Sequence, residues 1–294
     1  MYPDEFDYHR AESVDHALEL LSEHPGAEIL AGGHSLLPTM KSGLASPDHL
    51  VDIGHIDSMQ GIDGGGDTVS LGALTTYADV AGSELVRENA TVVAEAAHEV
   101  GDVQVRNRGT VGGNVAHADP ASDLPGAMLA ADATLVAHGP DGPRHVGVDD
   151  FFEGMYATAL AEDELLTRVE LPAQPDAVGT YAKKPSPSSG YAMVGVAVSL
   201  TVDGGVVDEA RVGANGVIDH GVRLGPVEAA IVGERLDGET IEAAAARAGD
   251  DLDDWMLMDD LQASAEFRGQ LLEVYTERAL TEAAERAGTV TVTA

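Results

Sequence analysis

The segment from Thr110 to Asp123 constrains the fold more than any other part of the chain. Its sequence is TVGGNVAHADPASD, a mixture of residues that neither a core strand nor a regular helix ordinarily tolerates. The adjacent Gly112 and Gly113 allow positive φ angles and a close approach of the backbone to a ligand. Thr110 and Asn114 add hydrogen-bonding side chains, and inward-facing amides can form an anion-binding nest. We therefore expect an irregular phosphate-binding loop here, with a simple glycine turn as the alternative.

A second glycine-rich loop, Ala31 to Pro38 (AGGHSLLP), follows the apolar pair Ile29 and Leu30. This order predicts a strand, a tight turn and a short helical start. Neither loop contains the G-x-G-x-x-G or G-x-x-x-x-G-K-[ST] pattern, which argues against a Rossmann fold and against a P-loop. Because each loop carries a small hydroxyl residue next to its glycines, we expect the two loops to hold one diphosphate group from two sides.

Length and composition indicate a globular protein of more than one domain. The chain has 294 residues, of which 44% are hydrophobic. No apolar run reaches the roughly 18 residues of a membrane span. Cysteine is absent, so the chain forms no disulfide and offers no thiolate to zinc or to an iron–sulfur cluster. The first residues carry acids where a secretory signal would carry bases, so we expect a cytoplasmic protein.

The charge balance is strongly acidic. Asp and Glu number 51 against 16 Lys and Arg, which gives a formal net charge of −35. Self-repulsion on this scale destabilises a compact fold unless salt screens it, which favours a halophilic source. Nucleic-acid binding needs clustered basic residues, so we expect none. The acidic run from Asp250 to Asp254 lacks the glycine and the terminal glutamate of an EF-hand loop, and we interpret it as a solvated surface.

Hydrophobic periodicity and turn residues predict an α+β fold. Strand and helix alternate over 1–60, and a second α+β part follows over 61–174. A proline-containing linker at 172–179 leads into a C-terminal part, 175–294, in which helices back a sheet. The expected helices are 13–22, 85–90, 92–100, 124–131, 226–231, 240–248 and 265–287, and the expected strands are 28–30, 49–53, 68–71, 133–137, 146–152, 165–171, 192–202 and 206–214.

Five short motifs follow one another along the chain. They are AGGHSLLP (31–38), LGALTT (71–76), GDVQVRNRGT (101–110), DFFEG (150–154) and SGYAMVGVAV (189–198). In this order they resemble the FAD-binding medium subunit of the molybdenum hydroxylases, the family of aerobic carbon monoxide dehydrogenase and xanthine dehydrogenase. The resemblance implies a FAD-binding domain of two subdomains, of the vanillyl-alcohol-oxidase-like (PCMH) type, at 1–174. It further implies a small C-terminal α+β domain at 175–294.

The resemblance also implies which residues contact the flavin. The amides of residues 32–35 would hold the diphosphate together with the Ser35 hydroxyl, and the glycine segment after Thr110 would complete the grip. Histidines 34 and 117 would hydrogen-bond beside the cofactor, and we predict no metal site and no catalytic residue in this chain. The full predicted set of cofactor-binding residues is Ile29, Leu30, Ala31, Gly32, Gly33, His34, Ser35, Leu36, Thr110, Val111, Gly112, Gly113, Asn114, Asp123, Leu165, Lys183 and Tyr191.

Four members of this set lie outside the two loops. Asp123 would accept a hydrogen bond from a cofactor hydroxyl, with a helix N-cap as its alternative role. Leu165 would meet the flavin through its main chain, and Lys183 would lie near the cofactor. Tyr191 would cover one face of the flavin ring, with a half-buried strand tyrosine as the alternative.

By resemblance, the chain passes electrons from a partner's iron–sulfur clusters through FAD to an external acceptor. FAD would be noncovalent. Molybdopterin would be held by a large partner subunit and [2Fe-2S] clusters by a small one, in a dimer of heterotrimers. Arg106, Arg108 and the pair Phe151 and Phe152 are candidates for the partner interface, alongside core or cofactor-wall roles. The alternative functions are a self-sufficient FAD-dependent oxidase or dehydrogenase and a flavin-free scaffold.

Overall fold

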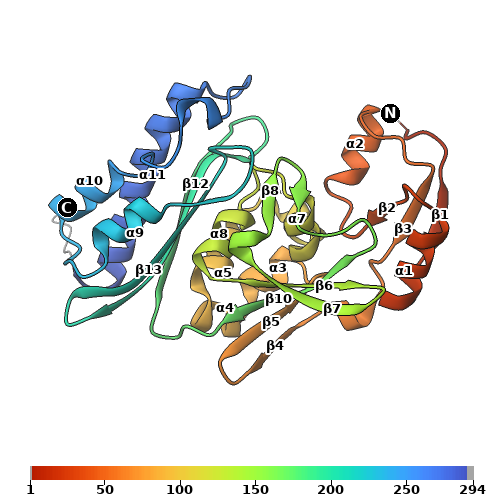
Figure 1. Ribbon diagram of the computed structural model, residues 1–294, viewed down its shortest axis with the longest axis horizontal. Helices are drawn as coiled ribbons and strands as arrows, with labels where there is room; N and C mark the ends of the chain where they lie inside the picture. The colour runs from red at the N-terminus through yellow and green to blue at the C-terminus, as the bar shows by residue number, and fades with distance from the viewer. Residues whose placement is uncertain (1, 290–294) are drawn as a thin grey trace.

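The N-terminal part of the chain is built on a small parallel sheet. The computed structural model describes residues 2–289, and this part lies at one end of the molecule (Figure 1). Its three strands run parallel in the order β1-β3-β2. The elements are β1 (Asp7–Arg10), α1 (Val14–Glu23), β2 (Glu28–Leu30), α2 (Leu36–Ser42) and β3 (His49–Asp52). The strand and helix alternation predicted for this region is confirmed.

Helix α1 shows how local sequence places these elements. The Ser13 side chain accepts a hydrogen bond from the His16 amide at 3.1 Å, which caps the helix N-terminus. Ala17 and Leu20 are buried against the sheet. The same apolar cluster includes Leu74 and Leu165 from the middle of the chain, so the N-terminal sheet is packed against the next part of the fold.

The middle part is a five-stranded antiparallel sheet with helices inserted between its second and third strands in sequence. The strand order is β4-β5-β10-β6-β7, with a separate β8-β9 hairpin. The strands are β4 (Ile62–Gly65), β5 (Thr68–Gly72), β6 (Thr134–Gly139), β7 (Gly142–Gly147), β8 (Phe152–Gly154), β9 (Ala157–Thr158) and β10 (Leu165–Pro172), and the helices are α3 (Tyr77–Gly82), α4 (Glu84–Asn89), α5 (Thr91–Glu99), α6 (Val103–Arg106), α7 (Val111–His117) and α8 (Leu124–Ala130).

Two predictions for this part are wrong. The region after Gly101, expected to be irregular, contains the helices α6 and α7. The strand expected at 146–152 is broken by a 3-10 turn at Val148–Asp150, which turns the Phe151 side chain into the core. Phe151 and Phe152 are both buried, with their rings edge to face at 5.2 Å between centroids. They therefore contribute to the core and cannot form a partner interface.

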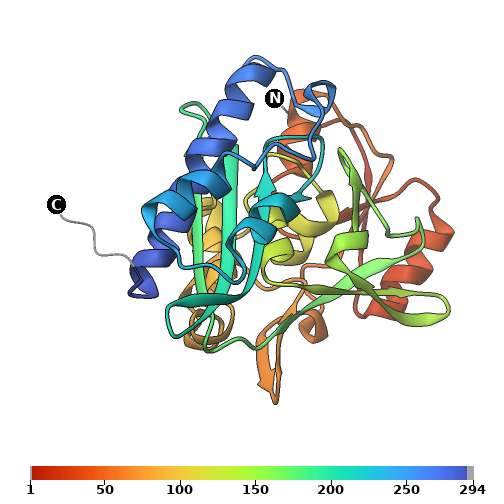
Figure 2. The ribbon, with the colours of Figure 1, turned by 60° about the vertical axis from the view of Figure 1, so that its left-hand side comes forward.

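The C-terminal part is a four-stranded antiparallel sheet, with its strands adjacent in chain order. Helix α11 covers one face, and α5 and α8 from the middle part cover the other (Figures 1 and 2). The elements are β11 (Val178–Pro185), β12 (Ala192–Asp203), β13 (Val206–Asn215), β14 (Val222–Arg223), α9 (Gly225–Ile231), α10 (Gly238–Ala245) and α11 (Ala265–Arg286), with a 3-10 turn at Asp254–Met256. Another 3-10 turn, Asp57–Met59, lies between β3 and β4. The sheet backed by helices is confirmed, although β11 was not predicted.

Helix α8 lies at the centre of the molecule. All seven of its residues, LPGAMLA, are buried. One side packs on α5, and the other packs on β12, β13 and β14 of the C-terminal sheet. The middle and C-terminal parts therefore share one continuous packed interface. Among the helices of residues 2–289, none combines the length and apolar character that crossing a membrane requires.

Candidate functional site

The two glycine-rich segments lie directly against each other. A Cβ atom on Gly32 would overlap the carbonyl oxygen of Arg108 and lie 2.9 Å from Cα of Gly109. Only glycine allows this contact between the loop after β2 and the turn that precedes α7. The next residue, Gly33, has φ +76°, a conformation that L side chains rarely adopt. The first loop thus needs Gly32 for its close approach to the second segment and Gly33 for its backbone conformation.

The first loop presents unpaired backbone donors. The amides of Gly32, Gly33, His34 and Ser35 donate to no backbone acceptor within residues 2–289. An isolated amide in a partly buried position needs a partner, because desolvating it without a hydrogen bond is costly. The residues that line the cleft here include no Lys or Arg. An anion bound at this loop would therefore be held by amide dipoles and not by Lys or Arg side chains.

The second segment has a different structure from the one predicted. Thr110 is the N-cap of α7, and its hydroxyl accepts from the Gly113 amide at 3.2 Å. The amides of Val111 and Gly112 donate to the carbonyls of Thr75 and Ala73, at 3.0 and 2.8 Å. Neither Gly112 nor Gly113 has positive φ. Gly112 is required for packing, since a Cβ there would collide with the Ala73 side chain.

A cleft of about 520 Å³ lies between the two segments, a size within the range of cofactor sites. Most of the predicted site residues line it, and five do not. The residues that line it are Ile29, Ala31, Gly32, Gly33, His34, Ser35, Leu36, Thr110, Gly112, Gly113, Asn114 and Leu165, and those outside the lining are Leu30, Val111, Asp123, Lys183 and Tyr191.

Asn114 leaves an acceptor free in this cleft. Its Nδ2 atom donates to the Tyr77 hydroxyl at 3.0 Å and to the Ser122 hydroxyl at 3.1 Å. Its Oδ1 atom is buried and has no partner within the described residues. Burial raises the pKa of Tyr77, so its hydroxyl stays protonated. A ligand hydroxyl or N–H donor would satisfy Asn114 Oδ1, which fits a polar cofactor in the cleft.

Asp123 and Lys183 form a buried network with each other. Lys183 Nζ donates to Asp123 Oδ2 at 3.0 Å and to the carbonyls of Glu99 and Gly190 at 2.6 and 3.0 Å. The Tyr181 hydroxyl donates to Asp123 Oδ1 at 2.6 Å. Burial raises the pKa of Asp123 to about 6, while Lys183 acts in the opposite direction. Asp123 stands at the N-cap position of α8, as the alternative predicts, but its side chain makes no capping hydrogen bond.

Tyr191 stands next to the cleft. It follows Gly190, which has φ +77°, in the turn between β11 and β12, and 41% of its surface is exposed. Burial is the main reason why the pKa of Tyr191 is raised, and Asp119 adds to it. The Ser35 side chain of the first loop is near enough to act on the Tyr191 hydroxyl and lowers its pKa. The side chain of this C-terminal turn therefore lies near the loop with the free amides.

Several lining residues were not in the predicted set. Leu74 belongs to the LGALTT motif and Tyr77 directly follows it. Tyr156 lies just after the DFFEG motif. The Tyr156 ring lies 5.0 Å from the ring of His117, which also lines the cleft. The motifs were identified from the sequence, but a motif alone does not predict which of the neighbouring side chains line the cleft.

The sequence matches two family profiles in succession. Residues 4–174 match the family described as the FAD binding domain in molybdopterin dehydrogenase. Residues 179–283 match the CO dehydrogenase flavoprotein C-terminal domain.

Sequence similarity to known proteins extends over nearly the whole chain. The glyceraldehyde dehydrogenase medium chain of Sulfolobus acidocaldarius is 33% identical over 97% of this chain and 100% of its own length. The carbon monoxide dehydrogenase medium chain of Hydrogenophaga pseudoflava is 36% identical over 96% of this chain and 98% of its own.

Solved structures agree with these matches. Carbon monoxide dehydrogenase from Hydrogenophaga pseudoflava contains a chain that superimposes with a TM-score of 0.93, at 38% identity over 97% of this chain and 99% of that one. Quinoline 2-oxidoreductase from Pseudomonas putida 86 gives a TM-score of 0.91, at 30% identity over 98% and 99% of the two chains. The chain therefore belongs to the family of FAD-binding medium subunits of the molybdenum hydroxylases.

Proposed function

We propose that this subunit binds one FAD noncovalently in the cleft between the first glycine loop and α7, and that it carries electrons between a partner subunit and an external acceptor. The observation that supports the location is the run of four amides, residues 32–35, that lack backbone acceptors beside a cleft lined by no Lys or Arg. A diphosphate supplies the acceptors that these amides need. FAD supplies the chemistry, because its ring system exchanges electrons in steps of one or two.

The remaining contacts follow from the donors and acceptors in the cleft. The Ser35 hydroxyl adds one donor to the four amides, and Asn114 Oδ1 accepts from a hydroxyl of the cofactor. Leu165 and Leu74 form an apolar wall. Asp123 and Lys183 lie outside the cleft lining and act indirectly. Their hydrogen bonds fix β11 and the turn that carries Tyr191 against the middle part of the fold. A direct contact of these two side chains with FAD stays a prediction.

Partner subunits complete the proposal. The chain has no cysteine, so it cannot hold an iron–sulfur cluster through thiolates. We assign the molybdenum cofactor to a large subunit and the [2Fe-2S] clusters to a small one, in a dimer of heterotrimers. Relatives named for glyceraldehyde and for carbon monoxide match along the whole chain, which supports a substrate site outside this subunit. Arg106 and Arg108 stay candidates for contacts with these partners.

A matched pair of glycine variants tests the cleft. Gly32→Ala places a Cβ against the backbone of Arg108, whereas Gly65→Ala on β4 meets no atom within 4 Å. We expect the Gly65 variant to purify with as much flavin as the wild type and the Gly32 variant to lose most of it. Flavin released by denaturation and measured per protein chain gives the result. Equal flavin content in the two variants would contradict the location of the site.

Co-purification distinguishes the electron-carrying subunit from the alternatives. Expressed with its genomic neighbours, the chain should be recovered with a large molybdenum-containing and a small cluster-containing protein. A chain that rapidly oxidises an organic substrate alone would favour the self-sufficient oxidase. A chain that is colourless and does not take up added FAD would favour the scaffold.

A further inference from the structure

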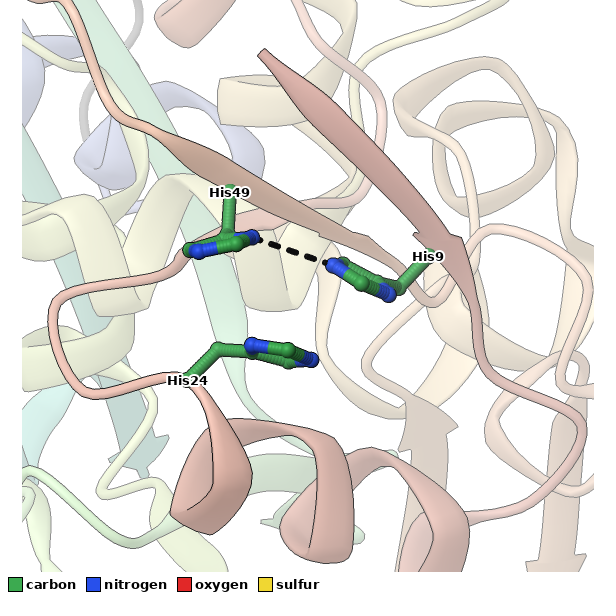
Figure 3. A group of neighbouring side chains, drawn as sticks. All are labelled: His9, His24 and His49. Atoms are coloured by element: carbon green, nitrogen blue, oxygen red, sulfur yellow. Dashed lines mark hydrogen bonds between the residues drawn. The ribbon is translucent and has the colours of Figure 1, made fainter.

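Three histidines converge at the edge of the N-terminal sheet (Figure 3). His9 lies on β1, His24 is the residue that ends α1, and His49 is the first residue of β3. All three side chains are half-buried. They come from three different elements, so the fold and not a local sequence motif brings them together.

The distances between the rings are short. His9 Nε2 lies 3.2 Å from His49 Nδ1, and one nitrogen from each of the three rings lies within 4.8 Å of the others. The His24 ring stacks on those of His9 and His49, with centroids at 4.2 and 4.3 Å. Figure 3 shows the His24 ring lying below the other two, with all three side chains directed toward one another.

We propose that His9, His24 and His49 form a binding site for one late first-row divalent cation, of which Zn²⁺ and Co²⁺ are the representatives to test. Two imidazoles that bind a tetrahedral Zn²⁺ at about 2.05 Å place their nitrogens roughly 3.3 Å apart. The 3.2 Å between His9 and His49 already matches this spacing. The His24 ring completes the set by a shift of no more than about 1.5 Å, which side-chain rotation provides.

The chemistry of the donors limits the cation. Neutral imidazole suits Zn²⁺, Co²⁺, Ni²⁺ and Cu²⁺, whereas Mg²⁺ and Ca²⁺ prefer oxygen ligands. The nearest carboxylate is that of Asp7, whose Oδ2 atom is 3.9 Å from His49 Nδ1 and whose side chain is 80% exposed. Water or Asp7 would fill the fourth position. The bound cation would replace the hydrogen bond that now joins His9 and His49.

None of the three histidines lines the cleft, although the cleft extends to Ala27 and Glu28 at the amino end of β2. His24 precedes β2 and His49 opens β3, so both lie at the amino ends of these parallel strands. The first glycine loop follows the carboxyl end of β2. A cation at the histidines would tie β1, α1 and β3 together without touching the flavin. We therefore assign it a structural role in holding the sheet that carries the glycine loop.

A titration with cobalt tests the proposal on the purified full-length chain after chelator treatment. Co²⁺ is added in molar KCl with excess Mg²⁺, so that the many surface carboxylates are screened and occupied. The readouts are the visible absorbance of nitrogen-ligated Co²⁺ and calorimetric stoichiometry. The variants are His9→Gln, His24→Gln and His49→Gln, and the control is His98→Gln, which changes an exposed histidine of α5.

We expect the wild type and the His98 variant to bind one Co²⁺ each, with Zn²⁺ displacing it and raising the melting temperature. Each variant of the three histidines should weaken binding by at least about tenfold and lose the cobalt absorbance. Melting curves recorded without metal show which variants are folded, and a single folded variant is sufficient for the comparison. A wild type without stoichiometric binding, or folded variants that bind as the wild type does, would overturn the proposal and leave the histidines as a stacked cluster.

Discussion

Lys183 Nζ lies 3.0 Å from Asp123 Oδ2, and this buried ion pair joins β11 to the residue that precedes α8. The two side chains are 5% and 6% exposed. Their partners are also protein groups, namely the Tyr181 hydroxyl and the carbonyls of Glu99 and Gly190. The pair therefore fixes the C-terminal sheet against the middle part, immediately behind the turn that carries Tyr191.

Removal of Lys183 should destabilise the fold strongly. In Lys183→Met, Asp123 keeps its burial and loses its counter-ion, which costs about 3–5 kcal/mol. The control is Arg247→Met, which breaks an exposed pair with Asp250 and should cost no more than about 1 kcal/mol. Denaturant unfolding at constant salt measures both. In the double variant with Asp123→Leu, most of the loss should be recovered, and a double variant as unstable as the single one would argue against this cause.

The pH dependence of stability should carry a contribution from Asp123. Its pKa is raised by burial to about 6 in the folded protein, against 3.8 for the free side chain. The folded state therefore binds this proton more tightly than the unfolded state does, and the free energy of unfolding falls as pH rises from about 4 to about 6. The size is on the order of 2–3 kcal/mol. Unfolding of the wild type and of Asp123→Asn across this range should differ in slope, and parallel curves would contradict the assignment.

Tyr191 should limit access to the flavin more than it contributes to affinity. Tyr191→Ala removes the ring and the hydroxyl, whereas Tyr191→Phe removes only the hydroxyl. Loss of ring stacking costs about 1 kcal/mol, so FAD should bind roughly fivefold more weakly to the Ala variant. Quenching of flavin fluorescence by iodide should increase in the Ala variant and stay near the wild-type value in the Phe variant. Equal quenching in all three proteins would contradict the prediction that Tyr191 covers one face of the flavin ring.

Salt should stabilise this protein. With a formal net charge of −35, the acidic side chains repel one another. Salt weakens this repulsion, because the Debye length shortens from about 10 Å at 0.1 M salt to about 3 Å at 1 M. We expect the melting temperature to rise through this range of KCl. Near pH 4, where many carboxylates are protonated, the same titration should have a smaller effect. A melting temperature that does not change with salt at neutral pH would contradict a halophilic adaptation.

Regular elements with a clear period were predictable from the sequence, and those governed by tertiary contacts were not. Helix α1 was found because Ser13 caps a strongly amphipathic run. Helix α7 was missed because its two glycines suggest a loop, whereas Gly112 is required by the packing of Ala73 against it. Strand β11 was missed because its first residues fall in the stretch 172–179, whose prolines and small residues indicate a linker, and its pairing with β12 is visible only in the fold.

The same distinction holds for the site. The proximity of the two glycine segments was predicted correctly, and the contact of Gly32 with Gly109 confirms it. Which amides are free was not predictable, because it depends on carbonyls of a third segment, those of Thr75 and Ala73. The burial of Asp123 and Lys183 likewise depends on the docking of two sheets. Sequence shows which groups are available, and the fold decides which of them are already engaged.

The position of α8 has a consequence for how the chain is made. Its residues emerge from the ribosome well before β12 and β13, the strands that cover its second face. Until those strands are synthesised, the alanine, leucine and methionine side chains on this face of α8 are exposed to water in the nascent chain. A fragment that stops at residue 174 should therefore aggregate or recruit chaperones, and maturation of the cleft should wait for synthesis of the C-terminal part, residues 175–294.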